Sequence, residues 1–117
     1  LYLKVARLVG KWGEDFRGEG GLNPVGVVVG ATAPGQAAAV REELPEAFFL
    51  VPGYGAQGGG ADALAPVFLD GGKGVVVNSS RSVLYAFDGQ GGDWRVAVGE
   101  AASRAREDLE AVRSSRV

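Results

Sequence analysis

Three short apolar runs, rich in β-branched and aromatic side chains, stand out along the chain and predict three β-strands. They cover residues 24–32, 47–51 and 74–78. The first and third are dominated by valine, which is typical of strands that are buried on both faces in a parallel sheet. The pattern therefore predicts a parallel sheet with both of its faces covered.

Between these runs, apolar residues recur at helical spacing and predict two connecting helices over residues 34–44 and 61–69. Thr32 lies two residues before a proline, which is a helix-start signal for the first of them. Asp62 is expected to cap the second. In the first helix, we expect Ala37, Ala38 and Val40 to point inward.

A helix is also predicted at each end of the chain. The N-terminal pattern starts without an N-cap residue before it, and Asp93 is expected to cap the long C-terminal helix. The apolar face of the N-terminal helix consists of Leu1, Val5, Leu8, Trp12 and Phe16. That of the C-terminal helix consists of Trp94, Ala97 or Val98, Ala101, Ala105, Leu109 and Val112.

The predicted order, α-β-α-β-α-β-α, indicates βαβ units with right-handed crossovers. Three parallel strands cannot close a barrel, and a (β/α)₈ barrel needs about 250 residues. We therefore expect an α/β fold in which residues 1–117 form a single partial domain, a little under half of such a barrel. The chain contains no Met and starts within a helical pattern, so we expect it to be part of a longer protein.

Composition excludes several kinds of chemistry. The 117 residues are 46% hydrophobic and 22% charged, with a net charge of −2 and no Cys or His. A thiolate nucleophile, an imidazole base and the usual zinc sites are thus excluded, and no acidic cluster indicates another metal. The scattered basic residues do not predict nucleic-acid binding, and no apolar stretch is long enough for a membrane span.

The second strand ends at Pro52 and gives way to a loop with five glycines among its next eight residues. Glycine allows positive φ and lets a ligand approach the main-chain N–H groups closely. Gln57 is the one uncharged polar side chain among them, and its amide NH₂ would donate a hydrogen bond to a bound anion. Such a loop after a buried strand is either an anion cradle or a flexible surface loop.

The third strand ends in Asn78, Ser79, Ser80 and Arg81. In barrels, a phosphate often lies between the loops that follow the last two strands, held by main-chain N–H groups. Arg81 would add a guanidinium group that matches phosphate oxygens. The alternatives are that Arg81 forms a surface salt bridge and that the serines only end the strand or cap a short helical turn.

Three segments together resemble orotidine 5′-phosphate decarboxylase, and most closely its longer bacterial subfamily. They are the Val-Val-Val-Gly-Ala-Thr segment at 27–32, the Leu-Val-Pro-Gly-Tyr-Gly-Ala-Gln-Gly-Gly segment at 50–59, and the Val-Asn-Ser-Ser-Arg-Ser segment at 77–82. The resemblance implies a (β/α)₈ barrel. This chain would be the C-terminal part of that barrel, from its fifth helix through its eighth.

The resemblance also implies roles for individual residues. The family's phosphate-gripping glutamine and arginine match Gln57 and Arg81. Its main-chain donors match Ser80 and Arg81, and Gly55, in the same motif as Gln57, is also expected to bind the phosphate. Its closing loop matches Pro52, Gly53 and Tyr54. The family implies a cytoplasmic homodimer that converts orotidine 5′-phosphate to UMP and CO₂ in pyrimidine biosynthesis without a cofactor.

The chain departs from the family at the catalytic centre, an Asp-x-Lys-x-x-Asp array on an earlier strand. Nothing here matches that array, because Lys4 and Lys11 lie on the first helix and Lys73 precedes the third strand. We therefore expect no catalytic residue in this chain, which would supply the phosphate-binding part. Another phosphate-binding barrel enzyme, or a non-catalytic phosphate- or nucleotide-binding module, remains as an alternative.

Overall fold

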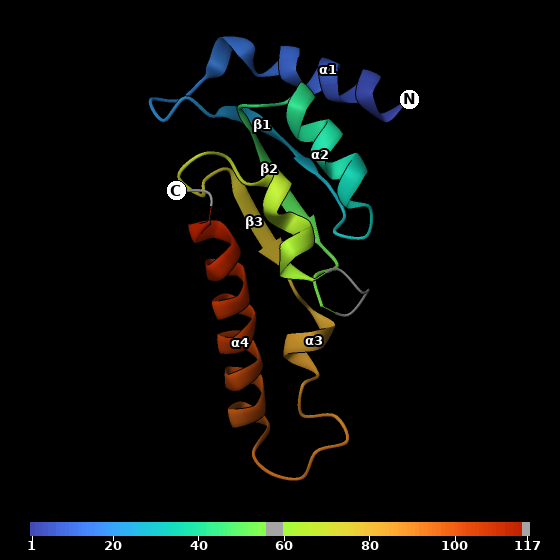
Figure 1. Cartoon of the computed structure of the whole chain (residues 1–117), viewed down its shortest axis with the longest axis vertical. Helices are drawn as coiled ribbons and strands as arrows, with labels where there is room; N and C mark the ends of the chain where they lie inside the picture. Colours follow the sequence, from blue (N-terminus) through green and yellow to red (C-terminus); the bar gives the residue numbers. More distant parts are fainter. Residues whose placement is uncertain (56–59, 116–117) are drawn as a thin grey trace.

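The computed structural model describes residues 1–55 and 60–115, which form a three-stranded sheet with helices packed on it (Figure 1). The strands are β1 (Asn23–Val28), β2 (Ala47–Pro52) and β3 (Val75–Asn78). They are parallel and adjacent in the order β1-β2-β3, so β2 is central. The three predicted strands and their parallel arrangement are confirmed, with the first strand ending before residue 29.

Helices precede, connect and follow the strands as predicted, but β3 is followed by a short extra helix that was not predicted. The helices are α1 (Tyr2–Trp12), α2 (Pro34–Glu43), the extra helix α3 (Arg81–Leu84) and α4 (Trp94–Ser114), with 3₁₀ helices η1 (Glu14–Phe16) and η2 (Ala61–Val67). The face of the sheet that they cover holds the core. On that face, Phe49 and Val51 of β2 are fully buried, together with Leu64 and Val67 of η2.

The other face of the sheet has no covering element among the described residues. Val28 of β1 is 69% exposed, Val76 of β3 is 48% exposed, and Leu50, which pairs with both in register, is 40% exposed. The prediction of a sheet buried on both faces was therefore wrong for this chain. Three strands cannot curve round to enclose their own inner face.

The N-terminal helix is shorter than its apolar pattern predicted and packs through a different face. α1 ends at Trp12, and its buried residues are Ala6 and Val9. The predicted apolar face points outward, with Leu1, Val5, Leu8, Trp12 and Phe16 between 47% and 97% exposed. Small residues at Ala6 and Gly10 let α1 approach its neighbours closely: a Cβ at Gly10 would lie 3.2 Å from Leu44 Cδ2.

Helix starts were predicted with mixed success. Asp93 caps α4 as expected, because its Oδ1 accepts a hydrogen bond from Arg95 N at 2.9 Å. The helix start signalled by Thr32 and Pro34 is also confirmed, because α2 begins at Pro34. Asp62 does not act as a cap, since η2 follows Gly60 and has no side-chain cap. The segment predicted as a helix over residues 61–69 is a 3₁₀ helix that ends earlier.

The inward face of α2 was largely predicted. In α2, Ala37 and Val40 are buried as expected, whereas Ala38 is half-buried. Of the helices in the part of the chain that the structure describes, none combines the length and apolar character needed to cross a bilayer.

Candidate functional site

The ends of β2 and β3 meet at one edge of the sheet. Pro52, the last residue of β2, is the register partner of Asn78, the last residue of β3. Just beyond, the hydroxyl of Ser79 donates a hydrogen bond to the carbonyl of Tyr54 at 3.2 Å. The hydroxyls of Ser79 and Ser82 lie 2.6 Å apart and share a hydrogen bond. The two predicted loops are thus joined directly.

Gly55 lies against the second loop and has a backbone conformation that favours glycine. Its φ is +81°, and a Cβ there would lie 2.9 Å from Ser82 Oγ. A side chain at this position would be strained and would push the loops apart. Glycine is therefore required for the close approach.

Arg81 is the first residue of α3, and its side chain is exposed. Within residues 1–55 and 60–115, its guanidinium forms no ion pair or hydrogen bond, so this part of the chain offers no surface salt bridge for it. The main-chain N–H groups of Ser80 and Arg81 also lack an acceptor in the described region. One edge of the sheet therefore presents a free cation beside free N–H donors.

Ser80 precedes α3, but its side chain makes no capping hydrogen bond. Ser79 and Ser82 bind the neighbouring loop instead. The alternative that Ser80 caps a short helical turn through its side chain was therefore wrong. The two outer serines join the loops, and Ser80 offers its main-chain N–H.

The residues predicted as a closing loop form the start of the connection after β2. Pro52 ends the strand, Gly53 has a φ of +90°, and Tyr54 is only 7% exposed. Gln57, the predicted phosphate-gripping glutamine, lies outside the described residues. Its role and that of the closing loop stay predictions.

Tyr54 also contacts a residue to which the sequence assigned no role. Its hydroxyl donates a hydrogen bond to Asp108 Oδ2 on α4, at 3.1 Å. Burial, followed by this hydrogen bond and the negative charge of Asp108, raises the pKa of the Tyr54 phenol. No local pattern could reveal the pair, because 54 positions separate the two residues.

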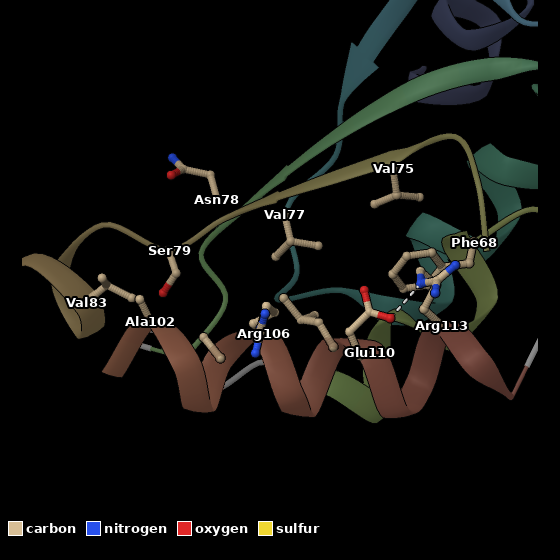
Figure 2. A pocket seen from close by; sticks show the side chains of 12 residues that line it. Phe68, Val75, Val77, Asn78, Ser79, Val83, Ala102, Arg106, Glu110 and Arg113 are labelled. Atoms are coloured by element: carbon tan, nitrogen blue, oxygen red, sulfur yellow. Dashed lines mark hydrogen bonds and ion pairs between the residues drawn. The ribbon is translucent and has the colours of Figure 1, made fainter. Parts of the chain in front are cut away.

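Two hollows flank the joined loops. One, of about 390 Å³, lies between Gly55, Ser82 and α4, with Asp108 and Arg104 on its wall. The other, of about 480 Å³, lies between β3 and α4 (Figure 2). Val75 and Val77 point into it, whereas Asn78 points away toward the uncovered face of the sheet.

The groove between β3 and α4 is lined by neither Ser80 nor Arg81, and its Arg106 makes no ion pair within the described residues. Its walls are mainly apolar, and at its rim Arg113 pairs with Glu110 at 2.9 Å. Nor do residues 1–55 and 60–115 contain a group of three or more acidic side chains placed to hold a metal ion. The joined strand ends are therefore the strongest candidate for a binding site.

No family model matches the sequence. Individual proteins do: the chain is 45% identical over 117 aligned residues to orotidine 5′-phosphate decarboxylase of Bordetella pertussis, with 97% of the chain covered. It is 46% identical over 110 residues to the decarboxylase of Halobacterium salinarum, with 93% covered. The chain is homologous to part of orotidine 5′-phosphate decarboxylase. It spans about two fifths of the curated relatives it matches, 40% and 38% of these two.

Solved structures named for orotidine 5′-phosphate decarboxylase have the same fold. The Toxoplasma gondii structure superimposes with a TM-score of 0.80 at 27% identity, covering 100% of this chain and 43% of that one. The Leishmania donovani structure gives 0.67 at 31% identity, covering 97% and 38%. The three strands and their helices are therefore a partial α/β fold that matches decarboxylase barrels.

The lysines of the described chain lie away from the joined loops. Lys4 and Lys11 are on α1, and Lys73 directly precedes Gly74 at the amino end of β3. The described residues thus place no lysine beside the joined strand ends.

Proposed function

We propose that this chain supplies the phosphate-binding part of an orotidine 5′-phosphate decarboxylase, which converts orotidine 5′-phosphate to UMP and CO₂. The observation that carries the proposal is the junction of the two strand ends. There, Gly55 packs against Ser82 and the unpaired Arg81 lies beside unpaired main-chain N–H groups. Phosphate sites in barrels are built in this way at the carboxyl ends of the strands.

Each proposed residue has a distinct role. The Arg81 guanidinium pairs with the phosphate dianion, and the N–H groups of Ser80 and Arg81 donate to its oxygens. Gly55 keeps the main chain close enough to reach them. Gln57, placed by its motif alone, adds an uncharged amide donor. Pro52, Gly53 and Tyr54 begin the loop that closes over the phosphate.

The binding energy of a remote phosphate can hold the reacting part of a substrate in a dry site. Loss of CO₂ leaves a carbanion that must be protonated, and the described chain places no lysine near the phosphate site. The proton donor and the carboxylates that act on the substrate therefore belong to another part of the full-length enzyme. The reaction as proposed uses no cofactor.

Turnover by purified proteins tests this assignment. The full-length protein should consume orotidine 5′-phosphate and release UMP and CO₂ in equal amounts, whereas the 117-residue chain alone should release neither. A full-length protein that binds UMP but leaves orotidine 5′-phosphate intact would instead favour another phosphate-binding barrel enzyme. Turnover by the isolated chain, free of full-length enzyme, would refute the proposal that the catalytic residues lie in another part of the protein.

We also propose that the full-length enzyme is a cytoplasmic homodimer. Exposed apolar side chains in α3, the segment after it and the first turn of α4 support a subunit contact there, namely Leu84, Tyr85, Phe87, Trp94 and Val96. Sedimentation of the full-length protein should give twice the monomer mass. A monomer at micromolar concentration would contradict this, and fractionation of cells would test the compartment.

A further inference from the structure

Tyr54 connects the first loop to the second loop and to the last helix at the candidate phosphate site. Its side chain leaves the end of β2, becomes 93% buried, and reaches Asp108 on α4. Its carbonyl accepts the hydrogen bond from Ser79 at the end of β3, and a longer one from Ser82 of α3 at 3.5 Å. A single residue therefore holds the first loop against both the second loop and the last helix.

The main chain that Tyr54 anchors is the part that must face the phosphate. Gly55 follows it directly and contacts Ser82, which is adjacent to Arg81. Within the described residues, the hydrogen bonds between side chains and main chain that join the two loops all end on the Tyr54 carbonyl. A shift of Tyr54 would thus alter the spacing between Gly55 and Arg81.

We propose that Tyr54 and Asp108 are positioning residues for phosphate binding, an inference that rests on the proposed function. The Tyr54–Asp108 hydrogen bond fixes the start of the first loop, up to Gly55, before the ligand arrives, so less conformational freedom is lost there on binding. The C-terminal helix α4 thereby takes part in phosphate recognition without touching the phosphate. Asp108 acts through Tyr54, and Tyr54 acts through the main chain at Gly55.

The chemistry of the pair suits this role. An ionised aspartate only accepts hydrogen bonds, and a protonated phenol donates one. Burial and Asp108 both raise the pKa of Tyr54, which favours the protonated phenol that donates this hydrogen bond. Arg104 lies on the same cavity wall but pairs with Glu100 at 3.6 Å, and the described residues give Asp108 no cationic partner.

The test compares a ligand with and without phosphate in the full-length protein. Dissociation constants for UMP and for uridine are measured with Tyr54→Phe, Asp108→Ala and Asp108→Asn. Tyr54→Phe and Asp108→Ala should each weaken UMP about tenfold, the size of one charge-assisted hydrogen bond, and change uridine less than about twofold. Asp108→Asn keeps an acceptor oxygen and should recover part of the loss.

Tyr2→Phe is the matched control, because Tyr2 is half-exposed and its hydroxyl makes no hydrogen bond within the described residues. It should leave both constants unchanged. A double variant, Tyr54→Phe with Asp108→Ala, should lose no more than Tyr54→Phe alone, since both changes remove the same bond.

The outcomes separate the inference from the function on which it rests. A wild-type protein that neither binds UMP nor decarboxylates orotidine 5′-phosphate overturns both. An active wild type with unchanged UMP binding in Tyr54→Phe and Asp108→Ala overturns the positioning role alone. Equal weakening of UMP and uridine would show general loss of structure and also overturn it. If Tyr54→Phe fails to fold, Asp108→Asn and Asp108→Ala still allow the comparison of UMP with uridine, because Asp108 is the exposed residue of the pair.

Discussion

The guanidinium carbon of Arg41 lies 3.6 Å from the ring centroid of Phe49, inside the core between α2 and β2. Arg41 is 6% exposed, and Phe49 is fully buried. The guanidinium donates four hydrogen bonds to main-chain carbonyls instead of pairing with a carboxylate; its acceptors are Leu44, Ala47, Val67 and Gly74. These carbonyls lie toward the amino ends of β2 and β3, opposite the candidate phosphate site.

Removal of this buried cation should destabilise the fold. Arg41→Met keeps much of the side-chain volume but leaves carbonyls without their donor, so we expect a loss of about 2–4 kcal/mol in the free energy of unfolding. Urea unfolding of the full-length protein measures it. Arg104→Met, at an exposed ion pair, is the control and should cost less than about 1 kcal/mol. Equal losses would mean that the buried hydrogen bonds of Arg41 stabilise the fold no more than an exposed ion pair does.

Replacement of the free arginine should weaken substrate binding and leave the fold intact. We expect Arg81→Ala to raise KM and lower kcat/KM for orotidine 5′-phosphate about a hundredfold or more, the size expected for loss of a charged partner. Arg81→Lys should restore only part of this, because an ammonium lacks the planar fork. Steady-state kinetics with a thermal melt of each variant checks both effects. An unchanged kcat/KM in Arg81→Ala would contradict the proposal that Arg81 binds the substrate phosphate.

Gly55 offers a test of the loop junction. Gly55→Ala adds a Cβ at positive φ, 2.9 Å from Ser82 Oγ, so we expect weaker UMP binding and a stability loss of about 1–2 kcal/mol. Gly35→Ala in the first turn of α2 is the matched control: its φ is not positive and its Cβ would meet nothing within 4 Å. That change should be neutral or stabilising by up to about 1 kcal/mol. Tight UMP binding by Gly55→Ala would contradict the close-approach role.

The raised pKa of Tyr54 predicts a specific loss of stability at alkaline pH. Its causes are burial of the phenol first and Asp108 second, and they raise the folded-state pKa above the unfolded value of about 10. The contribution of the Tyr54 phenol to the free energy of unfolding is therefore fully present below a pH of about 10, and it is lost as pH rises through the folded-state pKa. Unfolding free energies of wild type and Tyr54→Phe, measured over that range, should converge as pH rises. Parallel curves would show that the phenol titrates as in the unfolded chain.

Local sequence patterns predicted much of this architecture, because strand formation and capping depend on neighbouring residues. The valine-rich runs of β1 and β3, the apolar run of β2 and the Asp93 cap of α4 are all where those patterns indicated. The glycine loop and Arg81 could be paired in advance, because carboxyl ends of parallel strands share one edge of the sheet.

Tertiary contacts decided what periodicity leaves open. A helical pattern shows which residues share a face but not which face meets the core, and α1 packs through Ala6 and Val9 with its larger apolar face outward. Pro66 within η2 lacks an N–H donor, and that segment is a 3₁₀ helix in place of the predicted helix.

The sequence by itself thus determined the three strands, their parallel order and the two polar strand ends, since each follows from local residue chemistry. Only the tertiary structure decided that Arg41 lies buried on Phe49 and that Tyr54 binds Asp108. Both pairs join separate elements through the packing of side chains. Such contacts depend on where whole elements lie in space, which no local pattern of residues records.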